Sequence, residues 1–269
     1  MIHTVFSSDD SVYQQCQTDL LVHTYQKVGQ SGRLTRLWAG AGEPPAFPGY
    51  VFKTPSYAYH PVSGDHYPPY NRLFGLAAWL RETPPPEETI LHLEPDFIFT
   101  SPIEAEVERG RPIAHPFWHM YVRYAPTVAR RHCAHPERIQ PVGVPKLIHR
   151  DDLIEILPYW QAKTEAIRDD PQCREEAHWW SDMWGYVCAA AELDYHHTVQ
   201  EFGHHTSQDR SYPLIHYCVP VEVLSPAWQW YKGDYVPWQT VPPPPATAPY
   251  AMRVLIRELN ELAVLKRAL

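Results

Sequence analysis

The stretch TILHLEPDFIFTSPI, residues 89–103, decides the fold that we expect for this chain. Mostly apolar residues at 90–93 predict a short buried strand, and a second apolar run begins at residue 97. The turn Glu94-Pro95-Asp96 separates the two runs. Because proline cannot donate to a sheet ladder, Pro95 places this break at the end of the strand. The segment therefore predicts a core strand that stops at two carboxylates.

Glu94 and Asp96 are two positions apart on an extended segment, so their side chains point the same way. Carboxylate oxygens are the ligands that hard divalent cations prefer. The pair therefore predicts a metal site at the end of a core strand. A solvated acidic turn that holds no ion is the alternative.

Strand and helix patterns alternate around this segment. Residues 2–6 predict a strand, 12–25 a helix, 33–40 a second strand and 70–81 an amphipathic helix. This alternation is typical of an α/β fold in which a doubly wound, mostly parallel sheet is flanked by helices.

The first strand ends in small polar residues, which suit a nucleotide that contacts backbone N–H groups. We expect Phe6, Ser7 and Ser8 to lie at this place.

The rest of the chain is predicted in less detail. We expect one domain over residues 1–240, followed by a Pro-rich spacer and a C-terminal helix over 241–269. Further expected elements are a long ordered loop over 43–69, helices over 104–111, 150–170 and 175–193, and a late strand around 215–217.

Composition limits the function classes. A net charge of −8 argues against tight binding to a nucleic-acid backbone. The most basic stretch is the exception, and it is either a phosphate-binding patch or a solvated helix face; it holds Arg123, Arg130, Arg131 and Arg138.

Cysteine usage and hydropathy bear on the compartment. The five cysteines include no CxxC pair, so we expect free thiols in a reducing compartment. We expect no leader and no membrane span, because no apolar run approaches eighteen residues, and hence a cytoplasmic protein. Cys188 and Cys218 lie in apolar sequence and are expected to be inert packing thiols. The pairs His196-His197 and His204-His205 fit no common zinc motif and are expected in surface loops.

Several stretches, in this order, resemble the hydroxyproline O-arabinosyltransferases and, more distantly, the peptidyl-serine galactosyltransferases. They are VFSSDDSVYQQCQTDLLVHTYQKVGQSGRLTRL, YNRLFGLAAWL, LEPDFIF, PVGVPKLIHRDDLIEILPYWQAKTEAIRDDP, WWSDMWGYVCAAAEL and LIHY, and they cover most of residues 3–232. The resemblance implies a GT-A-like glycosyltransferase. It also implies a UDP-sugar donor, Mn²⁺ or Mg²⁺, and transfer of an arabinofuranose to a hydroxyl with retained anomeric configuration.

The resemblance also implies roles for individual residues. Asp96 and Glu94 match the metal and diphosphate site, and His216 resembles a further metal ligand. A half-buried strand histidine is the alternative for His216. Arg72 and Lys232 are the cations expected to face the diphosphate, although Arg72 also suits a helix surface.

Asp182 in WWSDMWGY stands where the family has a glutamate. A carboxylate in an aromatic helix is costly without partners, so we expect either a catalytic residue or a backbone-bonded one. As the catalytic residue, Asp182 would orient the acceptor hydroxyl or stabilise the developing sugar cation. Trp179, Trp180 and Trp184 suit sugar stacking or core packing.

The acceptor does not follow from the resemblance. A peptide, a small molecule or a hydroxymethylated nucleobase each remains open, the last as the substrate of a DNA-modifying arabinosyltransferase. A non-catalytic sugar- or nucleotide-binding module is an alternative of another class. A nucleotidyltransferase is a third, although the acidic SSDDS after the first strand does not suit it.

Overall fold

The computed structural model describes residues 1–209 and 211–268 and, at residue 204, the backbone alone. The described chain forms two compact units, each assembled from separate stretches of sequence. Unit 1 comprises Met1–Asp9, Gly32–Leu93 and Ala105–Gln200. Unit 2 comprises Asp10–Ser31, Glu94–Glu104 and Glu201–Leu269.

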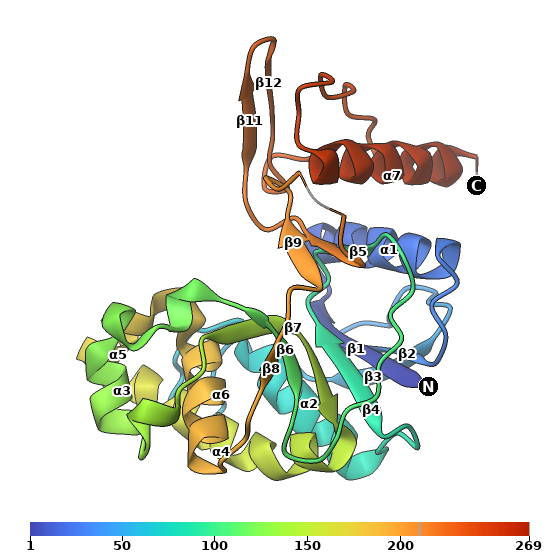
Figure 1. Cartoon of the computed structure of the whole chain (residues 1–269). Helices are drawn as coiled ribbons and strands as arrows, with labels where there is room; N and C mark the ends of the chain where they lie inside the picture. The colour runs from blue at the N-terminus through green and yellow to red at the C-terminus, as the bar shows by residue number, and fades with distance from the viewer. Residues whose placement is uncertain (210, 269) are drawn as a thin grey trace. The chain divides into compact units, whose positions relative to one another are not determined.

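Unit 1 is built on a seven-stranded sheet with the order β3-β2-β1-β4-β7-β6-β8 (Figure 1). Strands β3, β2, β1 and β4 run parallel, whereas β7 is antiparallel to β4 and to β6, and β8 is parallel to β6. All five residues of β4 are buried, as expected of a central strand covered on both faces. The strands are β1 Ile2–Asp9, β2 Leu34–Ala39, β3 Tyr50–Thr54, β4 Thr89–Leu93, β6 Ile113–Pro116, β7 Val142–His149 and β8 Thr198–Val199.

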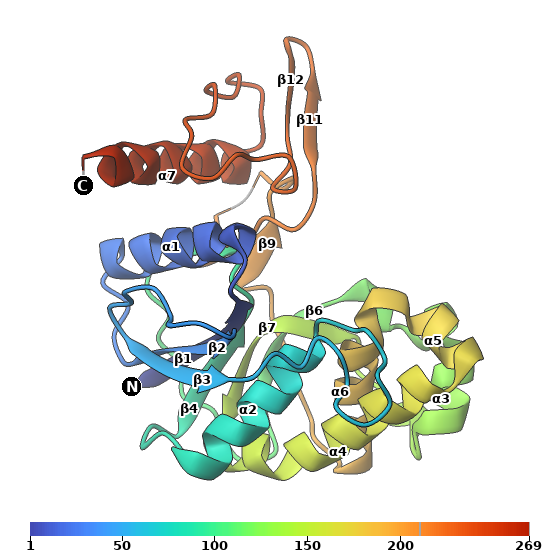
Figure 2. The ribbon, with the colours of Figure 1, turned by 180° about the vertical axis from the view of Figure 1, so that it is seen from behind.

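Helices pack on this sheet and on one another (Figure 2). Helix α2 contacts β1 and β2, while α4 contacts β7 and packs closely on α6. The close packing depends on Gly185, because a Cβ there would lie 2.2 Å from Thr164 Oγ1. The helices are α2 Tyr70–Glu82, α3 Pro126–His132, α4 Arg150–Asp169, α5 Pro171–Ala177 and α6 Ser181–Glu192, with 3-10 turns at Trp118–Met120, Val122–Tyr124, Pro136–Arg138 and His178–Trp180.

Unit 2 holds two helices that lie side by side, α1 (Val12–Lys27) and α7 (Tyr250–Arg267) (Figures 1 and 2). Ser11 caps α1 by accepting the Gln14 N–H. The apolar core of this unit includes Leu20, Leu255 and Leu259. Its strands form a three-stranded sheet in the order β5-β10-β9 and a β11–β12 hairpin; they are β5 Phe97–Phe99, β9 Gly203–His205, β10 Leu214–His216, β11 Val221–Leu224 and β12 Ala227–Trp230.

The expected α/β class with a mostly parallel sheet flanked by helices is confirmed. The expected strand that stops at Glu94 is also present, since β4 ends at Leu93. The expected helix at 150–170 is α4, whose first turn carries Asp151 and Asp152.

Three expected elements differ from the structure. Strand β3 lies inside the expected loop 43–69. Residues 104–108 are irregular instead of helical. Glu104 and Glu108 repel at helical spacing, and Gln30 holds Ile103 through both backbone groups. The expected single helix 175–193 is broken at His178, whose φ of 48° does not fit a right-handed helix.

The boundary expected at residue 240 does not separate the two units, because 201–269 belong to unit 2 as a whole. Among the described residues, no helix combines the length and the apolar character that crossing a bilayer requires.

Candidate functional site

The three-stranded sheet of unit 2 gathers the residues expected to bind a metal. His216 ends the central strand β10, and it pairs with Phe97 of β5. Asp96 directly precedes β5, and its carbonyl accepts the Tyr217 N–H at 3.1 Å. The register of β5 and β10 therefore brings the acidic turn beside the imidazole.

The side chains of this cluster face one another at short range. His216 Nε2 lies 3.4 Å from Glu94 Oε2 and 3.3 Å from Asp96 Oδ2. Lys232 donates to the same Asp96 oxygen. The His216 ring stacks on Phe97 with centroids 4.1 Å apart, which fixes its orientation. The structure thus brings together four residues expected at the site, and we name them the carboxylate cluster: Glu94, Asp96, His216 and Lys232.

The charges of the carboxylate cluster shift each other's pKa values. Burial raises the pKa of Asp96, but the charges of His216 and Lys232 outweigh it and hold that pKa below its ordinary value. Burial lowers the pKa of His216, whereas Asp96 raises it to a value well above the ordinary one. The pKa of Lys232 is likewise lowered by burial and raised by Asp96, with a net increase. Asp96 is therefore a carboxylate held between two cations.

The ligand set fits a divalent cation. Glu94, Asp96 and His216 each offer one ligand atom, and these atoms lie within 4.8 Å of one another. Two carboxylates and one imidazole suit Mn²⁺ or Mg²⁺, with the remaining positions open to phosphate oxygens. Lys232 supplies a further positive charge next to those positions.

Arg72 and Asp182 meet in unit 1, in a second buried polar cluster. Arg72 donates to Asp182 Oδ2, and the two side chains are only 9% and 1% exposed. The Tyr67 hydroxyl donates to Asp182 Oδ1 at 2.7 Å and accepts the Asp182 N–H at 3.0 Å. Trp160 Nε1 donates to the Asp182 carbonyl at 2.6 Å. Both carboxylate oxygens of Asp182 are thus bonded within the protein.

Phe6, Ser7 and Ser8 lie near the carboxyl end of β1 in unit 1. The pairing of β1 with β4 ends at Phe6, while the pairing with β2 continues to Asp9. Ser8 accepts a hydrogen bond of 2.7 Å from the buried Arg36. The three residues therefore lie at the carboxyl ends of the parallel strands, where nucleotides bind in α/β proteins.

The structure also places the tryptophans and the arginines that the sequence singled out. Trp184 is buried in the core and Trp179 is exposed, while Trp180 stacks on His119 with centroids 3.7 Å apart. In the basic stretch, Arg131 pairs with Asp170 and Arg138 with Asp194. These ion pairs favour a solvated helix face over a phosphate-binding patch.

Two features of unit 2 were missed in the sequence. Cys218, expected to be an inert packing thiol, is half-buried, and its Sγ lies 3.2 Å from His205 Nδ1. The side chain of His204 lies outside the described part of the chain. The sequence signal for this environment is His216, two positions before Cys218. Burial raises the pKa of Cys218, but hydrogen bonds with His205 and His216 lower it to about 7.

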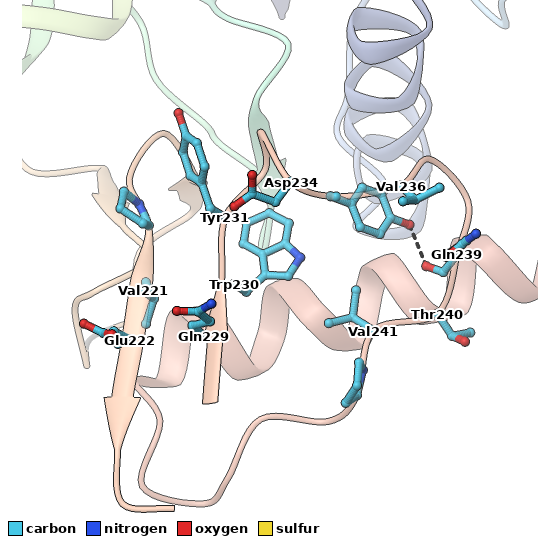
Figure 3. Close-up of a pocket in the computed structure, with 13 residues that line it drawn as sticks. Val221, Glu222, Gln229, Trp230, Tyr231, Asp234, Val236, Gln239, Thr240 and Val241 are labelled. Carbon is cyan, nitrogen blue, oxygen red and sulfur yellow. Dashed lines mark hydrogen bonds between the residues drawn. The ribbon is translucent and has the colours of Figure 1, made fainter. Parts of the chain in front are cut away.

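The second missed feature is a cavity of about 560 Å³ beside the segment that carries Lys232 (Figure 3). Glu222 and Gln229, paired across the β11–β12 hairpin, line one wall. Trp230 and residues 239–242 also line it. An aromatic ring together with carboxylate and amide groups suits a polar organic ligand.

Comparison with known proteins gives concordant matches. The model described as the hydroxyproline O-arabinosyltransferase family N-terminal domain matches residues 2–199. The chain is 30% identical to the peptidyl serine alpha-galactosyltransferase of Arabidopsis thaliana, over 91% of the chain and 34% of that protein. It is 28% identical to hydroxyproline O-arabinosyltransferase 1 of the same plant, over 71% of the chain and 55% of that protein. The chain thus spans about a third and about half of these two relatives' lengths.

Solved structures with the same fold are glycosyltransferases. The galactosyltransferase LgtC, solved with donor and acceptor sugar analogues, superposes with a TM-score of 0.56 at 15% identity, over 98% of this chain and 95% of LgtC. The apo bifunctional glycosyltransferase WbbM gives a TM-score of 0.59 at 10% identity, over 99% of this chain and 51% of WbbM. The expected GT-A-like fold is confirmed by these similarities.

Proposed function

Because the chain belongs to the hydroxyproline O-arabinosyltransferase family, we propose that it is a metal-dependent glycosyltransferase. It moves a sugar, L-arabinofuranose first among the candidates, from a UDP-sugar to an acceptor hydroxyl with retention. The carboxylate cluster carries the proposal, since it pairs two metal-binding carboxylates with an imidazole and a lysine.

The residues of the carboxylate cluster have distinct roles in this reaction. Glu94 and Asp96 bind the cation, and His216 does so once it has lost its proton. A bound Mn²⁺ or Mg²⁺ supplies charge neutralisation for the departing diphosphate. Lys232 donates to a diphosphate oxygen, which stabilises the negative charge as the sugar bond breaks. Phe6, Ser7 and Ser8 are assigned to the nucleotide.

The buried cluster of Arg72 and Asp182 allows two roles for Asp182. Asp182 holds Arg72 and Tyr67 in one arrangement. As a catalytic residue, Asp182 would exchange one of these bonds for the acceptor hydroxyl or the sugar. As a positioning residue, it would hold the Arg72 guanidinium in one orientation.

The acceptor is assigned to the hydroxyl of a peptide residue, because the two relatives named above carry peptidyl serine and hydroxyproline in their names. The cavity beside Lys232 offers such a ligand aromatic rings, carboxylates and amides; they belong to Trp230, Tyr231, Tyr235, Glu222, Asp234, Gln229 and Gln239. In that case Gln229→Ala raises the KM for the acceptor and leaves the KM for the donor unchanged.

Thermal unfolding with Mn²⁺ and UDP tests the donor site before any acceptor is known. A ligand at about 100 times its Kd stabilises the folded protein by about 2.7 kcal/mol, so the midpoint should rise. The rise should need both Mn²⁺ and UDP and be absent in Asp96→Asn. Glu104→Gln, which changes an exposed carboxylate of the same unit, should keep it. The absence of any nucleotide-dependent rise in the unaltered protein would favour the non-catalytic binding module.

A further inference from the structure

The sheet of unit 2 also places sulfur and nitrogen ligands around His216. In the order β5-β10-β9, His216 lies on the central strand, and its register partner on β9 is His205. The two rings stack with centroids 5.8 Å apart. Cys218 follows His216 by two positions, so the alternation of an extended chain turns its thiol to the same side.

These three side chains are close enough for one small cation. His205, His216 and Cys218 each offer a ligand atom, and these atoms lie within 4.8 Å of one another. A tetrahedral Zn²⁺ spaces nitrogen and sulfur ligands about 3.3–3.7 Å apart, given its usual bond lengths. The distance between Cys218 Sγ and His205 Nδ1 is 3.2 Å, so little movement is needed.

We propose that His205, His216 and Cys218 form a second metal site, selective for Zn²⁺ and similar borderline cations. We name it the thiolate site. Thiolate and imidazole ligands favour Zn²⁺, whereas the carboxylates on the other side of His216 favour Mn²⁺ or Mg²⁺. The fourth position of the tetrahedron is left to a solvent molecule.

The two metal sites share one ligand, and this makes them compete. A neutral imidazole has one nitrogen lone pair, so His216 binds one cation at a time. Zn²⁺ at the thiolate site therefore removes His216 from the carboxylate cluster. It also places a divalent charge near the position that Mn²⁺ or Mg²⁺ requires. Zn²⁺ is thus expected to inhibit any reaction that depends on the carboxylate cluster.

The competition rests on the proposed function, but the existence of the thiolate site does not. Co²⁺ bound to a thiolate gives an intense charge-transfer absorption in the near ultraviolet, whether or not sugar is transferred. Titration of the metal-free protein with Co²⁺ should produce this band. Zn²⁺ should remove the band by displacement, because a tetrahedral set of thiolate and imidazole ligands binds Zn²⁺ more tightly than Co²⁺.

Three variants locate the band. Cys218→Ser should abolish it, and His205→Gln should weaken Co²⁺ binding by at least about 10-fold, because the loss of a residue that only supports a metal ligand already costs about that much. Cys16→Ser is the matched control: this buried thiol of α1 lies in the same unit, and its removal should leave the band unchanged. Far-ultraviolet circular dichroism establishes that each variant is folded, and Cys218→Ala serves where the serine variant is not.

The Co²⁺ band also measures the competition between the two metal sites for His216. Excess Mn²⁺ should weaken Co²⁺ binding in the unaltered protein and lose this effect in Asp96→Asn, in which the carboxylate cluster is disabled. No band in the unaltered protein, or a band that survives in folded Cys218→Ser, would overturn the thiolate site. Equal Mn²⁺ competition in Asp96→Asn would overturn the shared ligand. A normal band in a protein that transfers no sugar would refute the proposed function alone.

Discussion

Asp96 and Asp182 are both buried carboxylates that contact a cation, yet their surroundings differ. Asp96 lies between His216 and Lys232, beside a second carboxylate, Glu94. Asp182 gives one oxygen to Arg72 and the other to Tyr67. Around Asp96, groups that can bind a metal or exchange a proton lie close together. Around Asp182, both carboxylate oxygens are already hydrogen-bonded within the protein. Burial of an acid therefore does not identify a reacting group, and the partners of the acid must be considered.

The largest expected effect is on turnover in Asp96→Asn. A bound metal contributes several kcal/mol of charge stabilisation in the transition state, so donor turnover should fall about a thousandfold or more. The fold should remain, since the amide keeps the shape of the side chain, His216 can lose its proton, and Lys232 is 17% exposed. Donor hydrolysis or transfer in the presence of Mn²⁺ measures the rate, and circular dichroism measures the fold.

Glu104→Gln is the control for Asp96→Asn, because its carboxylate is exposed and belongs to the same unit. Its donor turnover should equal that of the unaltered protein. Wild-type turnover in folded Asp96→Asn would disprove the metal assignment and leave the carboxylate cluster as an ion-pair network.

The next effect is on the stability of Asp182→Asn. This change leaves the buried Arg72 charge without its carboxylate, and breaking one side of a buried pair costs about 3–5 kcal/mol. Urea unfolding should show the loss as a lower midpoint. Asp151→Asn is the control in unit 1: its side chain is 41% exposed, so the loss should stay below about 1 kcal/mol.

Unchanged stability together with lost turnover in Asp182→Asn would mean that Asp182, like Asp96, acts in the reaction. A variant that keeps the stability of the unaltered protein but loses turnover would assign Asp182 to the reacting site. The buried cluster would then act on the substrate, and its bonds in the free protein would be exchanged on binding.

These sites were only partly predictable from the sequence. The turn Glu94-Pro95-Asp96 was predictable because proline, two acids and an apolar run lie within a few residues. The contact of Asp96 with Lys232 was not, because the two residues are separated by 136 positions. The expected placement of the histidine pairs in surface loops was wrong for two of the histidines, and His205 lies in strand β9. His197 is buried against Tyr186, and burial lowers its pKa to about 3.

The division into two units could not be predicted from the sequence either. Unit 2 takes Asp10–Ser31 from one place and Glu94–Glu104 from another, and no change of composition marks these boundaries. Periodicity predicts the elements one at a time, whereas the pairing of α1 with α7 depends on contacts between distant residues.

A smaller effect concerns an acid of unit 2 that is bonded but not expected to react. Glu258 of α7 accepts from Lys27 at 2.7 Å and from Arg257. Burial raises the pKa of Glu258, but hydrogen bonds from His23, Lys27 and Arg257 lower it to about 2, from 4.5. Since the folded-state pKa is below the unfolded-state value, the stabilisation is complete above pH 4.5 and is lost as the pH falls towards about 2.

Glu258→Gln should therefore unfold at lower urea than the unaltered protein at neutral pH, by about 1–3 kcal/mol. The difference should shrink as the pH falls through the carboxyl range. Glu261→Gln is the control, because its side chain is 44% exposed and its pair with Lys27 contributes less than about 1 kcal/mol. A difference for Glu258→Gln that persists in acid would mean that packing, and not charge, stabilises this contact.

The smallest effect is expected in the basic stretch of unit 1. Arg131 is half-exposed and pairs with Asp170, so Arg131→Ala should leave the midpoint of urea unfolding nearly unchanged. It should not change turnover, because the charge of Arg131 is already matched by that of Asp170. Salt-dependent binding of single-stranded DNA, measured for the unaltered protein and the variant, tests the nucleobase acceptor. Tight binding that weakens in Arg131→Ala would reinstate that acceptor, since a guanidinium that leaves its acidic partner for phosphate would give this dependence.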